Sequence, residues 1–335
     1  MKVAFRQEKS DLTNRSRFVK LQNSNKNQTG GRAMIETIKI GRLRWLNIKT
    51  PSEEDFEFLE NSYHFHELDI EDCRQSNQRS KIDEYDDYYF LILHFPVLDR
   101  ENRFIKTREV KIFWGEDFII TVGKSHWIVD KLFDEAMEQD KRGEDFEIGT
   151  SDAFLYLILE KIMMETLFLL RKVGLELELI NRELFSGKPP RIIERLSVTR
   201  KNIILLNTMF KPQLRVFNKF ESGKVQGFAD NMEDYWGNIL DYYNKMWDMT
   251  EDYGELINGL STTFDSLQAN KTNEIMKILT LISSIILPLT FLTGLYGMNV
   301  LLPLQEDNLA FWIIIGIMVV VGGGMFAYFR RRKWM

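Results

Sequence analysis

The side chains best suited to meeting a metal ion stand at the ends of two long apolar runs. Asn299 closes the first run, within Tyr296-Gly297-Met298-Asn299, and the acidic pair Glu306 and Asp307 lies just before the second. Amide and carboxylate oxygens are hydrogen-bond acceptors, and oxygen ligands suit hard divalent cations. A Gly-Met-Asn string occurs often by chance, so its position between an apolar run and an acidic loop is what gives it weight.

A second group of potential ligands, around His64-Phe65-His66, does not support a metal centre. The group is followed by acids and the single cysteine of the chain, namely Asp69, Glu71, Asp72 and Cys73. No further His or Cys spacing matches a zinc site, and surface polarity and turn formation explain the group better. One cysteine also excludes an internal disulfide framework.

No motif for enzymatic catalysis is present. The glycines Gly322-Gly323-Gly324 lie in an apolar run and lack the lysine and the serine or threonine of a phosphate-binding loop. Four histidines in all form no Ser/His/Asp arrangement. The sequence therefore predicts a protein that is not an enzyme and that carries no cofactor.

The two apolar runs have the length and composition of membrane spans. Neither Ile278–Asn299 nor Asn308–Phe329 contains a charged residue, and about 20 residues are enough to cross the hydrocarbon core as a helix. Backbone amides inside a membrane must be paired internally, which favours helices. Both runs lie at the C-terminal end of the sequence, so neither is a signal peptide.

The charges around the spans predict their orientation. Basic residues precede the first span and follow the second: Lys271, Lys277, Arg330, Arg331, Arg332 and Lys333. The positive-inside bias then places both termini in the cytoplasm and the loop 300–307 outside. Glu306 and Asp307 in this loop could concentrate cations by long-range attraction. A solvated loop that only follows the topology explains them equally well.

Composition points to a globular cytosolic part with a net charge that argues against nucleic-acid binding. The 335 residues are 44% hydrophobic and 28% charged, with a formal net charge of −5. We predict the following segments: a polar tail at 1–33, an α/β domain at 34–150, a helical hairpin at 151–227, a stalk helix at 228–277, spans at 278–299 and 308–329 joined by the outer loop 300–307, and a basic tail at 330–335.

Within 34–150 the pattern predicts a mixed sheet with flanking helices. Runs rich in β-formers predict strands at Ile35–Ile40, Tyr88–Phe95, Val110–Phe113 and Phe118–Val122. Trp114-Gly115-Glu116-Asp117 reads as the hairpin turn between the last two. Ser52 is the expected N-cap of a short helix that reaches Asn61.

From Ser151 onward the periodicity is helical. One helix should run from about Asp152 to Leu184 and a second from Pro189-Pro190 to about Phe220. A third begins near Asp230 and meets no proline before Pro288. If it continues through the first span, about 70 residues give a rod of roughly 105 Å.

Several of these segments resemble the CorA-type magnesium channels. The resemblance is carried by Asn270-Lys271-Thr272-Asn273-Glu274-Ile275-Met276-Lys277, Leu287-Pro288-Leu289-Thr290-Phe291, Tyr296-Gly297-Met298-Asn299 and the Arg/Lys-Trp terminus. It is dense over about 265–335 and looser over 66–265, where Ile70-Glu71-Asp72 and Gln78-Arg79-Ser80-Lys81 also fit.

The resemblance implies an α+β cytosolic domain, long stalk helices and a two-helix transmembrane hairpin, assembled as a funnel-shaped homopentamer. Five first spans would line a central pore, with Gly297, Met298 and Asn299 as the selectivity filter. A ring of neutral amides can accept hydrogen bonds from the water shell of Mg²⁺ without stripping it. A ring of carboxylates would hold the ion more tightly.

Helical spacing indicates which residues would face that pore. One stripe of the first span becomes smaller and more polar toward Asn299 and comprises Met276, Leu279, Ser283, Leu287, Thr290 and Gly294. A constriction at Met276 and Leu279 could close the channel by dewetting. The alternative is that these residues only pack against neighbouring helices.

Closure by intracellular magnesium is expected from the family, but its acidic sites do not map cleanly. Two stalk positions that are often acidic fall on Asn238 and Thr262. The candidates for a regulatory site are Asp83, Glu84, Asp86, Asp87, Asp234 and Asp241. Each of these acids taken singly is also explained as part of a solvated face.

The sequence thus predicts a Mg²⁺ channel of the cell membrane, driven by membrane potential, with Co²⁺ and Ni²⁺ as further ions. Its partners would be other copies of the chain, membrane lipid and divalent cations, with Mg²⁺ as transported and regulatory ion. Two alternatives remain. One is a zinc or proton-coupled transporter on the same scaffold, which usually varies the Gly-Met-Asn string. The other is a membrane-anchored sensor that transports nothing.

Overall fold

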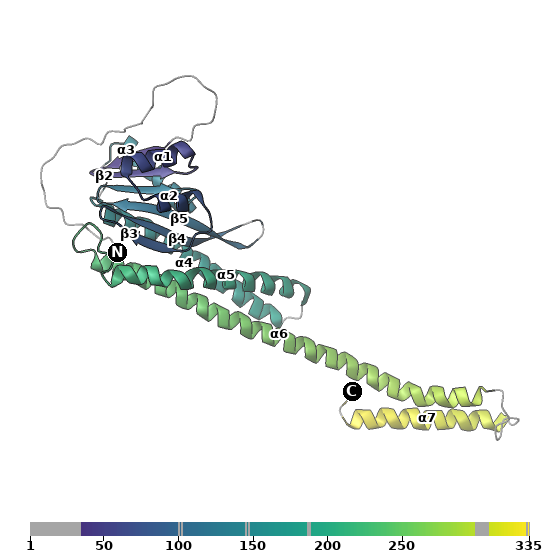
Figure 1. The fold of residues 1–335 in the computed structure, drawn as a ribbon. Coiled ribbons are helices and arrows are strands. Elements are labelled where there is room, and N and C mark those ends of the chain that lie inside the picture. Colours follow the sequence, from purple (N-terminus) through teal and green to yellow (C-terminus); the bar gives the residue numbers. More distant parts are fainter. Residues whose placement is uncertain are drawn as a thin grey trace. The chain divides into compact units, whose positions relative to one another are not determined.

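The computed structural model describes residues 35–99, 101, 103–144, 146, 148–185, 189–298, 308–332 and 334. The chain forms two compact units, Met1–Asn258 and Gly259–Met335 (Figure 1). The expected tail 1–33 and the outer loop 300–307, with Glu306 and Asp307, lie outside the described residues. So do Asn299 and Lys333.

A six-stranded mixed sheet forms the centre of the first unit. Its strands are β1 (Glu36–Ile40), β2 (Leu43–Ile48), β3 (Lys81–Glu84), β4 (Tyr88–Leu98), β5 (Ile105–Gly115) and β6 (Phe118–Val122). Their order is β1-β2-β6-β5-β4-β3, and only the pair of β2 with β6 is parallel. The mixed sheet expected from the sequence is confirmed, although β2 and β3 were not predicted.

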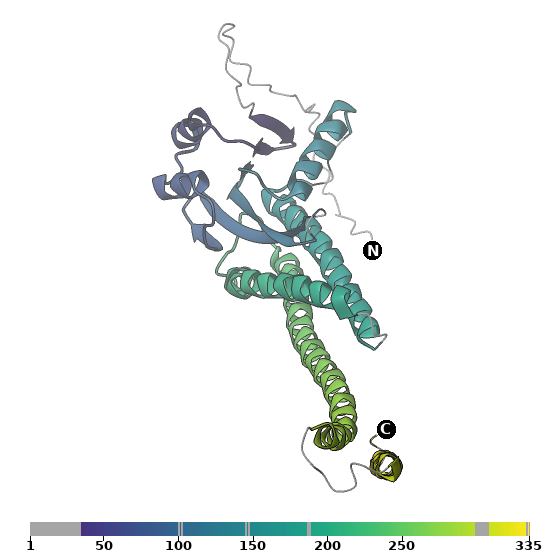
Figure 2. The same cartoon turned by 90° about the vertical axis from the view of Figure 1, so that its right-hand side faces the viewer.

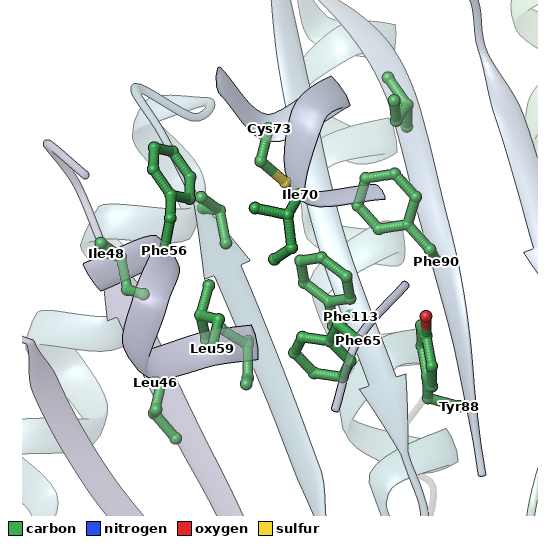
Figure 3. Close-up of a cluster of buried hydrophobic side chains, with 13 residues drawn as sticks. Leu46, Ile48, Phe56, Leu59, Phe65, Ile70, Cys73, Tyr88, Phe90 and Phe113 are labelled. Carbon is green, nitrogen blue, oxygen red and sulfur yellow. The ribbon is translucent and has the colours of Figure 1, made fainter. Parts of the chain in front are cut away.

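Helices α1 (Glu53–Tyr63) and α2 (Glu67–Arg74) cover one face of this sheet. Ser52 caps α1 as expected: its hydroxyl accepts from the Asp55 amide, and the Asp55 carboxylate accepts from the Ser52 amide. Figure 3 shows the apolar side chains of both helices directed at the sheet. This cluster comprises Leu46, Ile48, Phe56, Leu59, Phe65, Ile70, Cys73, Tyr88, Phe90, Ile92, Phe113, Ile120 and Val122.

Helices α3 (Trp127–Lys141) and α4 (Ser151–Leu184) lie on the other face of the sheet, as Figure 2 shows. The indole of Trp45 in β2 makes edge contacts with Phe133 of α3 and Phe154 of α4, with ring centroids 4.8 and 4.9 Å apart. Side chains alternate between the two faces along a strand, which is why Trp45 and Leu46 belong to different cores.

Helix α5 (Pro189–Glu221) packs against α4, and its Gln213 side chain hydrogen-bonds to the backbone of His94 in β4. The Arg195 guanidinium of α5 forms ion pairs with Glu176 and Glu183 of α4, at 2.7 and 2.6 Å. Both helices match the expected segments, and the break after α5 falls at Ser222-Gly223, where Gly223 has a φ of +67°.

Helix α6 (Glu233–Tyr296) begins in the first unit and provides the first helix of the second unit. Its 64 residues are helical throughout, including Pro288, so the expected continuity is confirmed. Pro288 has no amide hydrogen, and the carbonyl of Ser284 therefore loses its intrahelical donor. Helix α7 (Asn308–Arg331) completes the second unit and lies beside the last turns of α6 (Figure 1).

Candidate functional site

The second unit is a pair of apolar helices that touch along one side of α6. A Cβ on Gly322 of α7 would lie 3.6 Å from Leu289 Cδ1 of α6, which is ordinary van der Waals contact. Residues of α6 on the same side are buried or half-buried: Leu281, Ser284, Ile285, Pro288, Leu289, Leu292, Leu295 and Tyr296. The contact with α7 thus defines a covered face of α6.

The stripe predicted from helical spacing lies on the opposite face of α6. At about 100° of rotation per residue, its centre is about 160° away from the covered face. All six of its residues are exposed in the single chain, including Met276, Leu279 and Leu287, with 55%, 55% and 74% of their surface accessible. The structure therefore places these residues together on a face that α7 leaves uncovered.

Two hydroxyls on this stripe, those of Ser283 and Thr290, differ from the hydroxyls of the other threonines of the span. Thr280 and Thr293 donate back to carbonyls of their own helix, Met276 at 2.8 Å and Thr290 at 2.9 Å. Within the described residues the hydroxyls of Ser283 and Thr290 have no hydrogen-bond partner, and both side chains are exposed. A hydroxyl without a partner is costly in hydrocarbon, which favours contact with water or a hydrated ion. Half-buried Ser284 also lacks a partner in this part of the chain.

Both helices have the properties of membrane spans. Windows of α6 and of Phe311–Arg331 in α7 reach a mean hydropathy of 2.1, with only 6% and 0% of their residues buried. An apolar surface of this extent needs lipid or other helices to cover it. The α6 window is thus exposed where the core helix of a soluble protein would be buried.

The helix ends at the tripeptide that the sequence singled out. The Gly297 amide donates to the Thr293 carbonyl at 2.9 Å, and exposed Met298 follows. A Cβ on Gly297 would lie 3.1 Å from that carbonyl oxygen, tighter than most real contacts. Glycine therefore permits a close final turn directly before Asn299.

The six acids proposed for regulation are not gathered within the described residues. Asp83 and Glu84 lie on β3, Asp86 and Asp87 in the following turn, and Asp234 and Asp241 on an exposed face of α6. In the described part of the chain no three His, Cys, Asp or Glu side chains are close enough to hold a metal. Their role stays a prediction for a site between copies.

Asp83 already has a cationic partner. The Lys81 ammonium forms ion pairs with Asp83, with Asp72 at 2.7 Å and with Asp69 at 3.7 Å. Asp69 is fully buried and its pKa is raised, mainly by burial, although it also accepts from the Tyr88 hydroxyl at 3.0 Å. The sequence did not predict this network. Two spacings in the sequence could have indicated it. Asp69 and Asp72 are three residues apart and so share one side of a helix, and Lys81 and Asp83 are two residues apart and so share one face of a strand.

Two sequence features have structural roles. His64 ends α1 with a φ of +57°, and the His66 ring accepts from the Leu68 amide at 3.2 Å as the N-cap of α2. The expected turn formation is therefore confirmed for the two histidines, whereas the expected surface position is wrong for Asp69 and Cys73, which are buried. Asn238, where the resemblance places an acid, donates to the Tyr156 hydroxyl at 2.7 Å. Burial is the main cause that raises the pKa of Tyr156 to about 12.

The chain is similar to known proteins over most of its length. The family model of CorA-like Mg²⁺ transporter protein matches residues 41–331. The cobalt/magnesium transport protein CorA of Thermotoga maritima is 23% identical, over 87% of this chain and 83% of its own. The putative metal ion transporter YfjQ of Bacillus subtilis is 26% identical, over 87% and 89%. The complete structure of the CorA magnesium transporter from Methanocaldococcus jannaschii superposes with a TM-score of 0.75, at 23% identity, and covers 88% of this chain and 92% of that one.

Proposed function

The chain belongs to the family of CorA-like Mg²⁺ transporter proteins, and we propose that it is a Mg²⁺ channel formed by five copies around a common axis. It is therefore a transporter rather than an enzyme. The observation that carries the proposal is the uncovered stripe of α6, opposite α7, with the unpartnered hydroxyls of Ser283 and Thr290. A helix with one covered face, and an opposite face that becomes smaller and more polar toward its outer end, suits the inner ring of a pore.

Asn299 supplies the chemistry of selection at the outer mouth. Its carboxamide oxygen is a neutral acceptor, and five of them would meet the waters around Mg²⁺ rather than the bare ion. Gly297 and Met298 shape the turn that presents it. Glu306 and Asp307 would raise the concentration of cations nearby. Co²⁺ and Ni²⁺ have similar hydrated shells and are further candidate ions.

Membrane potential is sufficient to drive the flux. An inside-negative potential contributes about 2.3 kcal/mol per charge and 100 mV, thus about 4.6 kcal/mol for a divalent ion. Arg330 and Arg331 end α7 and Arg332 follows it. By the positive-inside bias, both termini would lie on the cytoplasmic side of a cell membrane.

Closure would occur at the inner end of the stripe. Met276 and Leu279 are bulky and apolar, and five copies brought together form a constriction that excludes water. Intracellular Mg²⁺ would favour this state by bridging acids of neighbouring copies, with Glu84, Asp86, Asp87, Asp234 and Asp241 as candidates. Asp83 is the weakest candidate, because Lys81 already neutralises it.

Ion flux into liposomes tests this function. The purified chain is reconstituted with a Mg²⁺-sensitive dye inside, and a K⁺ diffusion potential is applied with valinomycin. We expect influx that rises with the inside-negative potential at equal pH on both sides. Influx that demands a pH gradient would favour the zinc or proton-coupled alternative. Equal dye signals with and without protein would favour the sensor.

A further inference from the structure

A large groove in the first unit is lined by none of the residues proposed to face the pore. It has a volume of about 1250 Å³ and lies between three elements of the same unit. One wall is the segment 77–83, which leads into edge strand β3. The second is a face of α5 that includes Thr208, Lys211 and Arg215, and the third is formed by Trp247 and Glu251 of α6.

The groove is cationic in a chain whose net charge is negative. Five basic side chains line it against two acids, Asp83 and Glu251, and they are Arg79, Lys81, Lys211, Arg215 and Lys219. His94 also lines it, and burial lowers the pKa of its imidazole, which favours the neutral ring. The chain as a whole carries a net charge of −5. The positive charge is therefore concentrated locally.

Three of these cations have neither an ion pair nor a hydrogen bond within the described residues. Lys81 is held by carboxylates, and Lys219 donates to the Ile82 carbonyl at 3.3 Å. Arg79, Lys211 and Arg215, by contrast, form no ion pair or hydrogen bond with any described residue, and all three are exposed. Lys211 and Arg215 are one helical turn apart and thus project from the same side of α5.

The walls that carry these side chains are fixed. Gln213 of α5 is fully buried; its amide accepts from the His94 amide at 2.7 Å and donates to the His94 carbonyl at 2.9 Å. The segment before β3 is held by Ser80, whose hydroxyl is 2.8 Å from His94 Nδ1, and by the Gln78 amide, which donates to Glu109. The backbone segments that carry the cations are therefore held in place before any ligand binds.

We propose that this groove binds a nucleoside polyphosphate, a function independent of the proposed conduction. Arg79, Lys211 and Arg215 would contact the phosphate oxygens, which suit the planar donors of arginine in particular. Trp247 would stack on the base. Its ring is half-buried at the groove wall and contacts no other aromatic ring of the described chain, and stacking of this kind adds affinity whichever base is present.

Calorimetric titration of the full chain in detergent micelles tests the site. ATP and inorganic triphosphate are titrated separately, with EDTA present so that Mg²⁺ does not contribute. We expect ATP to bind and the double variant Lys211→Ala/Arg215→Ala to weaken it at least tenfold. Trp247→Leu should weaken ATP several-fold and leave triphosphate unchanged. Arg200→Ala is the control, since Arg200 is an exposed cation of α5 that does not line the groove.

Three results would overturn the proposal. Absence of ATP binding to the native chain excludes the site, and so does equal weakening by Arg200→Ala. Equal affinity for ATP and triphosphate, unaffected by Trp247→Leu, excludes the nucleoside. If native protein fails to bind ATP while the double variant elutes as a smaller oligomer, the groove instead receives an acidic surface of a neighbouring copy.

Discussion

Gly322 of α7 packs against Leu289 of α6, close enough that a Cβ on the glycine would meet Leu289 Cδ1 at 3.6 Å. This contact fixes which side of α6 is turned to its hairpin partner. The opposite side carries Ser283, Thr290 and the rest of the stripe. A one-residue change in helix rotation, about 100°, would move that stripe out of place.

Gly322→Leu should disturb the hairpin more than Gly323→Leu. The added side chain must displace Leu289, and overpacking of this kind costs about 1–3 kcal/mol. Nothing in the described chain lies within 4 Å of a Cβ at Gly323. Thermal stability of the detergent-solubilised oligomer measures the difference. Equal loss in both variants would contradict the observed contact.

Thr290→Cys should react with a membrane-impermeant thiol reagent and lose conductance, whereas Leu289→Cys should react slowly. Position 290 lies on the proposed pore face and position 289 against α7. The native cysteine should not react with the reagent. Cys73 is buried, and burial raises the pKa of its thiol to about 12, so little thiolate forms at pH 8. Faster modification at 289 than at 290 would refute the assignment of the pore face.

Gln213→Met should destabilise the first unit by about 3 kcal/mol. Strand β3 begins at Lys81, which pairs with Ile92 of β4. Beyond this pair, the Gln213 side-chain amide takes over the hydrogen bonding of β4 at His94. Methionine would leave the His94 amide and carbonyl unpaired, which costs about 1–3 kcal/mol for each group. Urea unfolding followed by tryptophan fluorescence measures the change. Exposed Asn218 on the same helix is the control, and Asn218→Ala should alter stability by less than about 0.5 kcal/mol.

The first unit should lose stability as the pH falls from about 6.5 to 4. Burial lowers the pKa of His126 to about 4 in the folded chain, against about 6.5 when unfolded. In that window the unfolded chain binds more protons, so the free energy of unfolding decreases with falling pH, by up to about 1.4 kcal/mol per pH unit. His126→Asn keeps an N-cap acceptor for the Ile128 amide. It should flatten this slope. An unchanged slope would assign the acid sensitivity to other groups.

The long helices α4, α5 and α6 and the two spans were predictable because each has a strong periodicity of its own, whereas the shorter α2 and α3 were not predicted. Phe118–Val122 was predicted with its observed bounds, and the N-cap Ser52 was identified correctly. Strand β3, Lys-Ile-Asp-Glu, was missed because its polar residues fit no strand pattern; pairing with the long, apolar β4 imposes the conformation. The same pairing brings Lys81 to Asp69 and Asp72. Such convergence of distant residues cannot be read from spacing.

Only the part of the site that lies on a single helix could be predicted from the sequence. The stripe from Met276 to Gly294 is a property of helical geometry, and the structure places all six residues on the face away from α7. Contacts between neighbouring copies depend on how the copies assemble, and the sequence of one chain does not determine this. The regulatory acids Asp234 and Asp241 therefore stay a prediction.

The most direct test of ion selection by Asn299 compares Mg²⁺ influx through the native protein with influx through Asn299→Ala, in dye-loaded liposomes under the same inside-negative potential. Asn218→Ala, far from either span in sequence, serves as the matched control for removal of a carboxamide. We expect Asn299→Ala to abolish most of the influx and Asn218→Ala to conduct like the native protein. Native influx through Asn299→Ala would contradict this expectation.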